Sequence, residues 1–172
     1  MAIVKSTSVT NMFATPAVRE PAHRDGGVLR ESASNVVIAA DESASNDLIA
    51  VRVPSNARVS QVLLSYADAT TGGAIDVGIW KEVATAPGTF EAVDDDLFAS
   101  AMVLTDGPLW NKDITNESAE YTAAEQEKML WEVLGLSADP KIDYFVGSDI
   151  TTVCDGCSTV GILYKVRYVV GP

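Results

Sequence analysis

Strand-length apolar segments recur along the chain at intervals of about 10 to 15 residues, and turn-forming residues separate them. Four such segments occupy residues 36–40, 48–53, 58–66 and 74–80. In the last of them Ile75, Val77 and Ile79 fall on one face, as in a strand with one side in a core. No helical segment separates these strands. The pattern therefore predicts a mainly β protein, an antiparallel β-sandwich, rather than a series of β-α-β units.

The second half of the chain predicts one helix. Thr122 and Glu125 have the spacing of a capping box, in which the two side chains bind free amides of the first helical turn. Apolar residues continue at helical intervals up to Gly135, which suits the left-handed position after a last turn. We therefore expect a short helix at about 123–134, packed over one end of a sheet.

Further strands are expected on both sides of this helix. Residues 98–104 fit a strand or a short helix, residues 141–146 fit a strand, and residues 158–170 give the strongest strand pattern. In the last segment Lys165 and Arg167 share one parity, so they lie on the face opposite the apolar one. The residues of the apolar parity are Val160, Ile162, Tyr164, Val166 and Tyr168.

Residues 1–34 differ from the rest of the chain. They contain Pro16 and Pro21, many small polar residues and no clear apolar period, which predicts an extended N-terminal arm followed by a β-sandwich domain at 35–172. The arm has four basic and three acidic residues, whereas the rest has eight basic and 21 acidic. Two interpretations remain open: a loose terminus, or an arm that becomes ordered against a neighbouring subunit. The basic residues of the arm are Lys5, Arg19, Arg24 and Arg30.

Charge and composition argue against several classes of partner. A net charge of −12 and a pI near 4.3 argue against nucleic acid, because binding phosphates needs an excess of Lys and Arg. No apolar segment approaches the roughly 20 residues of a membrane-spanning helix, so we expect no membrane partner. The first residues lack the pattern of a secretory signal, which favours synthesis in a reducing cytoplasm. A chain of 172 residues buries enough surface to fold without a metal or a disulfide.

Residues that could carry chemistry are few. Cys154 and Cys157 flank an Asp-Gly hairpin signal, and three interpretations stay open: two thiols beside a tight turn, an optional local disulfide, or a redox or metal pair. A zinc site needs four ligands, and the single histidine, His23, lies in the arm. Asp94–Asp96 lacks the spacing of a calcium loop and is interpreted as a solvated acidic turn. We predict no catalytic residue, no cofactor and no metal site.

Three tryptophans lie far apart in the sequence. Trp80 ends an expected strand and Trp131 lies in the expected helix, so both are predicted to pack in the core. Trp110 follows Pro108 in an expected loop and is the best candidate for an exposed aromatic that contacts a partner.

Five segments carry a resemblance to known proteins: residues 1–8 (MAIVKSTS), 52–62 (RVPSNARVSQV), 73–80 (GAIDVGIW), 98–101 (FASA) and 165–170 (KVRYVV). With the proline-containing arm, they resemble small virion structural proteins of tailed bacteriophages, and head decoration (cement) proteins are the most similar in size and character. The resemblance implies a jelly-roll-like β-sandwich, often a homotrimer. It also implies binding to the outside of the capsid, where the protein bridges subunits of the major capsid protein on a virion assembled in the bacterial host cytoplasm.

We therefore expect a non-enzymatic virion protein whose partner contacts come from its arm and from one aromatic residue: Lys5, Arg19, Arg24, Arg30 and Trp110. Three alternatives remain. The chain could be another head–tail or tail component. It could be a β-sandwich module that binds carbohydrate or a receptor through Trp110 or Tyr66, or a thiol enzyme that uses the two cysteines.

Overall fold

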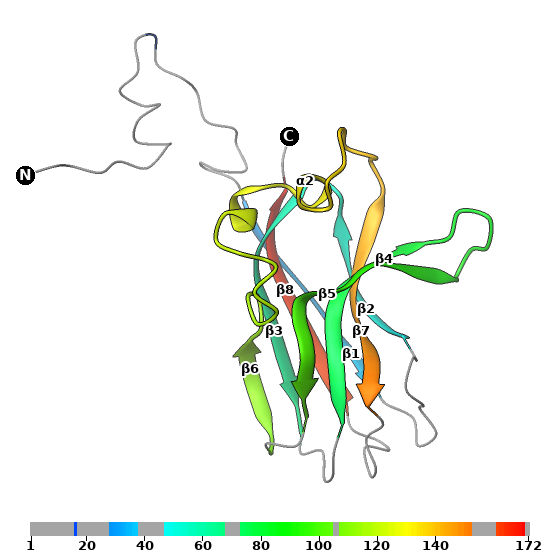
Figure 1. Cartoon of the computed structure of the whole chain (residues 1–172), viewed down its shortest axis with the longest axis vertical. Helices are drawn as coiled ribbons and strands as arrows, with labels where there is room; N and C mark the ends of the chain where they lie inside the picture. Colours follow the sequence, from blue (N-terminus) through cyan, green and yellow to red (C-terminus); the bar gives the residue numbers. More distant parts are fainter. Residues whose placement is uncertain are drawn as a thin grey trace, which may run out of the picture.

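Two antiparallel sheets of four strands face each other in the computed structural model, which describes residues 16, 28–37, 47–67, 73–104, 107–152 and 161–170 (Figure 1). Sheet A has the strand order β1 (Leu29–Val37), β8 (Gly161–Val170), β3 (Ala57–Tyr66) and β6 (Leu109–Asp113). Sheet B has the order β2 (Asp47–Pro54), β7 (Asp143–Thr152), β4 (Ala74–Glu82) and β5 (Phe90–Val103).

The strands pair in a nested pattern. β1 pairs with β8 and β3 with β6 in sheet A, while β2 pairs with β7 and β4 with β5 in sheet B. The chain is thus doubled back at the connection between β4 and β5, and successive pairs alternate between the two sheets. This nesting is the jelly roll, which confirms the expected β-sandwich of jelly-roll type.

Alternating apolar residues build the core between the sheets. Ile75, Val77 and Ile79 of β4 are fully buried, as their spacing predicts. On β8 the predicted inward face is also buried, at Ile162, Tyr164, Val166 and Tyr168. One buried polar contact crosses the core, because Ser148 of β7 and Tyr164 of β8 share a hydrogen bond of 2.6 Å between their hydroxyl groups.

Two facing glycines allow the backbone to fold over the outer side of sheet B. Gly78 of β4 and Gly147 of β7 lie opposite each other in the strand register. A Cβ on Gly78 would lie 2.6 Å from the carbonyl oxygen of Asp95, and a Cβ on Gly147 would lie 2.5 Å from that of Leu48. β2 and β5, the strands that approach these glycines, have irregular register at these points. The missing side chains of the glycines therefore provide the space that the bulges of β2 and β5 occupy.

The expected helix at 123–134 is wrong in its length. The structure has a 3-10 turn, η1 (Glu125–Glu127), and one α-helical turn, α2 (Leu130–Val133), separated by extended backbone at Lys128 and Met129. The side chains of Thr122 and Glu125 bond to each other instead of binding the amides of the first turn. The carboxylate of Glu132 accepts the Met129 N–H at 2.8 Å, so a second local start interrupts the helix. Gly135 has the expected left-handed backbone, with φ of 72°.

Other boundaries also differ from the expectations. β1 begins at Leu29, so the last residues of the expected arm belong to sheet A. Residues 98–104 lie largely in the long strand β5, which also contains Asp94–Asp96, so this acidic segment is part of a strand and not a turn. Trp110 lies in the short strand β6 rather than in a loop. The cysteines fall outside the described residues.

Candidate functional site

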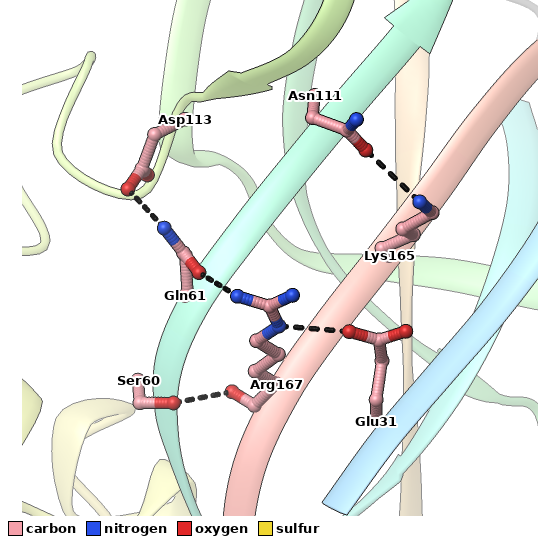
Figure 2. A network of polar contacts seen from close by, with 7 residues as sticks. All are labelled: Glu31, Ser60, Gln61, Asn111, Asp113, Lys165 and Arg167. Carbon is pink, nitrogen blue, oxygen red and sulfur yellow. Dashed lines mark hydrogen bonds and ion pairs between the residues drawn. The ribbon is translucent and has the colours of Figure 1, made fainter.

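A row of polar side chains crosses all four strands of sheet A on its outer face (Figure 2). Arg167 of β8 lies between Glu31 of β1 and Gln61 of β3 in the register. Its Nε donates to Glu31 Oε2 at 2.7 Å and its Nη1 donates to Gln61 Oε1 at 2.8 Å. Gln61 Nε2 in turn donates to Asp113 Oδ2 at 2.7 Å, which carries the row to β6.

The charges of this polar row are satisfied within the face. The hydrogen bond from Arg167 lowers the pKa of Glu31. Burial alone would raise the pKa of Asp113, but hydrogen bonds from Thr115 and Gln61 outweigh it and lower this pKa. Lys165 Nζ donates to Asn111 Oδ1 at 2.9 Å beside the row. Two cations and two anions therefore balance here, on a body that is strongly acidic.

A largely apolar groove continues the outer face of sheet A beyond the polar row. Trp110 of β6 borders it with 70% of its surface exposed, which confirms the expected exposure of this residue. The groove has a volume of about 310 Å³ and is lined by Asn35, Ser65, Tyr66, Ala67, Trp110, Asn111, Gly161, Leu163 and Lys165. Tyr66 is only 1% exposed, because it follows Val62 and Leu64 on the inward face of β3. The idea that Tyr66 is an exposed stacking platform is therefore wrong.

The other tryptophans and the remaining predicted contact residues are placed as follows. Trp80 is fully buried, as predicted, and Trp131 is half-buried. Arg30 is exposed on β1, at the mouth of a groove between β1 and β2. It does not lie beside Trp110, because β1 and β6 are the two outer strands of sheet A. Lys5, Arg19 and Arg24 fall outside the described residues.

Two groups of carboxylates lie on sheet B and at its edge. Asp76, Asp95 and Asp149 form one group and Asp94, Asp96 and Glu120 form the other, each with oxygen atoms within 4.8 Å of one another. Burial, followed by repulsion from neighbouring aspartates, raises the pKa of Asp149. Burial and then Glu120, Asp96 and Asp95 raise the pKa of Asp94. Such oxygen donors suit a hard divalent cation, but exposed carboxylates also cluster without one, and we assign no metal to them.

Buried titratable groups in the described part of the chain serve the core. Burial raises the pKa of both Tyr121 and Tyr164. Tyr121 donates its hydroxyl proton to the Val59 carbonyl at 2.7 Å and packs edge-on against Phe98, so it fixes the connection after β6 to the core. His23, Cys154 and Cys157 lie outside the described residues, so the structure does not test the thiol chemistry considered from the sequence. Among the residues that the structure describes, no helix has the length and apolar character needed to cross a membrane.

The sequence pointed to only part of this surface. The parity of Lys165 and Arg167 places both cations on the outer face of their strand. Their partners Glu31, Gln61 and Asn111 come from strands far away in the sequence, and nothing local marks them. The register between strands brings these residues together, and register is not visible in a single strand.

Comparison with known proteins finds solved structures that share this fold. No protein-family model matches the chain, and no curated protein matches it. A chain of the structure "Capsid of Ralstonia phage GP4" matches with a TM-score of 0.61 and 16% identity, over 85% of this chain and 86% of that one. The fold is one found in bacteriophage capsids. A chain of "Cyanophage Pam1 capsid asymmetric unit" matches with a TM-score of 0.52 and 15% identity, over 89% of this chain and 92% of that one. At these identities the two likenesses establish the fold alone.

Proposed function

We propose that this chain is a non-enzymatic structural protein of a bacteriophage virion, which binds the outer surface of the capsid and stabilises the head by bridging capsid subunits. One observation carries the proposal: the two matching solved chains come from structures of phage capsids, and each match spans most of both chains. The sequence resemblance to virion structural proteins points in the same direction. The acidic body also suits such a role, because its net charge keeps free copies soluble before assembly.

The outer face of sheet A is the surface that we assign to the capsid. Interface centres are depleted of charged residues and enriched in tryptophan, so charges that a contact buries need partners. On this face Glu31 and Arg167 already neutralise each other, and Lys165 has a hydrogen-bond partner. Burying the polar row therefore leaves none of its own charges without a partner, while Trp110 offers a large apolar side chain at the edge of the face. We expect Trp110 to carry the largest single share of the binding energy.

The N-terminal arm supplies the second contact in this proposal. The described body begins beside β1, an outer strand of the same sheet. An arm of about 27 residues can span up to about 90 Å when extended, which is more than the length of any strand in the body. Lys5, Arg19 and Arg24 would then pair with carboxylates of a capsid subunit beyond the one that sheet A contacts. Binding two subunits with one molecule is what bridging requires.

The test uses phage heads that lack this chain, to which purified protein is added back. We expect Trp110→Ala to weaken binding about 30-fold, the effect of losing about 2 kcal/mol at an interface hot spot. Leu136→Ala is the matched control, because Leu136 is an exposed apolar residue that follows α2 and belongs to none of the strands of sheet A. Deleting residues 1–27 keeps all of β1 and should abolish head stabilisation, measured as the temperature at which heads release DNA.

Three results would contradict the proposal. Undiminished binding by Trp110→Ala would remove sheet A as the contact surface. Full head stabilisation by the deleted protein would remove the arm from the bridging contact. Binding to tails or to the head–tail junction but not to the shell would make the chain a different virion component.

A further inference from the structure

Arginines line a groove at one side edge of the sandwich, and carboxylates cluster at the other. β1 and β2 form one side, where they pack beside each other, and the strand order places β6 and β5 on the other side. The connection after β6 closes that second side, since Ser118 Oγ donates to the Leu97 carbonyl of β5 at 2.7 Å. Figure 1 shows β6 at the left of the sandwich and β2 at the right. A contact that joins the two sides would link copies of the chain head to tail.

The β1–β2 side is a groove of about 320 Å³ with arginines at its wall. Arg30, Ser32 and Ser34 occupy alternate positions of β1 on the side that faces sheet B, where a sandwich strand normally carries apolar residues. Arg52 lines the opposite wall with 70% of its side chain exposed, and it forms an ion pair of 3.4 Å with Asp143, which also lines the groove. Arg30 finds no partner among the described residues. We call Arg30, Arg52, Ser32 and Ser34 the basic groove.

The β5 side is acidic and crowded. Asp94, Asp96 and Glu120 bring their carboxylates within 4.8 Å of one another where β5 meets the connection after β6. We call these three residues the acidic edge. Mutual repulsion is part of the cause of the raised pKa of Asp94. A cation placed against the acidic edge would relieve that repulsion, and the chain carries such cations on its opposite side.

We propose that the basic groove of one copy receives the acidic edge of a second copy. The occupant follows from charge complementarity, because arginine forks pair with carboxylates and the Ser34 hydroxyl can donate to the same oxygens, whereas the Ser32 hydroxyl already shares a hydrogen bond of 3.2 Å with Tyr168. Each copy keeps one free groove and one free edge after the first contact. The contact is therefore heterologous and generates a closed ring or an open chain. This inference goes beyond the proposed capsid role and is tested on the isolated full-length protein.

The test is sedimentation velocity at low salt, with reversed charges on each side. The wild-type chain should sediment as an oligomer that dissociates as salt rises, because exposed ion pairs are screened. Arg30→Glu/Arg52→Glu and, separately, Asp96→Lys/Glu120→Lys should each weaken association by about tenfold or more. A chain that carries all four substitutions should assemble again, since the charges are exchanged rather than lost.

Mixing the two double variants tests the head-to-tail geometry. The groove variant keeps an intact acidic edge and the edge variant keeps an intact groove. An equal mixture should therefore assemble again in alternation, because the native groove meets the native edge and the reversed groove meets the reversed edge. Lys128→Glu is the control, because Lys128 is an exposed cation between η1 and α2 that belongs to neither the basic groove nor the acidic edge, and this variant should retain the wild-type oligomer.

A monomeric wild-type chain at about 100 μM, where contacts of useful strength are populated, would overturn the proposal. Double variants that assemble like the wild type, or a mixture that stays monomeric, would also overturn it. So would loss of the oligomer in Lys128→Glu. Circular dichroism checks that each variant is folded. Where the reversal of charge in the groove unfolds the chain, Arg30→Gln/Arg52→Gln keeps the side-chain size and should still lose the oligomer.

Discussion

Replacing Gly78 by alanine should destabilise the protein more than any other glycine-to-alanine change in the described strands. The new Cβ would lie 2.6 Å from the Asp95 carbonyl oxygen and closer still to the Asp94 carbonyl oxygen and the Asp95 carbonyl carbon. All of these are backbone atoms of the β5 bulge, so no side chain can rotate away. The bulge would have to move by about 1 Å or more in a closely packed structure.

The size of the effect follows from the cost of such a movement. Overpacking a well-packed site costs about 1–3 kcal/mol, and each weakened backbone hydrogen bond of the bulge adds about 1 kcal/mol. We expect Gly78→Ala to lower the free energy of unfolding by about 3 kcal/mol or more. For a chain of this length that corresponds to a fall in Tm of about 6–12 °C, measured by calorimetry.

Gly161→Ala is the matched control within another strand. Its Cβ would meet the side-chain oxygen of Asn35 at 2.7 Å, but Asn35 is exposed on the outer strand β1 and can turn aside. We expect a cost within about 1 kcal/mol. Equal changes in Tm for the two variants, or a change below about 2 °C for Gly78→Ala, would show that backbone does not cover Gly78.

Two further predictions concern polar groups. Ser148→Ala should lower the free energy of unfolding, measured in urea, by about 1–3 kcal/mol, because it leaves the buried Tyr164 hydroxyl without its partner. Adding Tyr164→Phe should recover part of this loss. Full additivity of the two changes would argue against the hydrogen bond. Burial, then Asp47 and Asp76, raise the pKa of Asp149 in the folded state, so the folded state takes up the proton more readily than the unfolded chain. The stability that this group contributes is therefore lost as pH rises through its folded-state pKa. Asp149→Asn should raise Tm at pH 7 and flatten the dependence of Tm on pH. An unchanged pH profile would contradict the raised pKa of Asp149.

The sandwich could be predicted because its core strands alternate. Ile75, Val77 and Ile79 show the two-residue period within one segment, and burial enforces it. β6 could not be predicted in this way, because it has five residues and its exposed Trp110 is apolar. The helix was overestimated because local spacing favoured it, while the Glu132 carboxylate starts a separate turn at Met129.

The binding surfaces depend on contacts that no local pattern encodes. Glu31 and Arg167 are 136 residues apart in the sequence, and their hydrogen bond forms only when β1 and β8 are in register. The acidic segment at Asp94 looked like a turn because three adjacent aspartates disfavour strands. The bulge over Gly78 holds this segment in β5, and a glycine inside a strand is the one local feature that is compatible with such a close approach of backbone.

The nested pairing also determines when the molecule can fold. β8 lies between β1 and β3, so sheet A has no continuous ladder until residues 161–170 have left the ribosome. The first strand synthesised therefore pairs only after the last one has been made. Such a topology has a high contact order, and proteins of high contact order fold slowly. A chain that stops before β8 cannot join β1 to the rest of sheet A, so a prematurely terminated copy would fail to fold rather than compete with intact copies for a binding position.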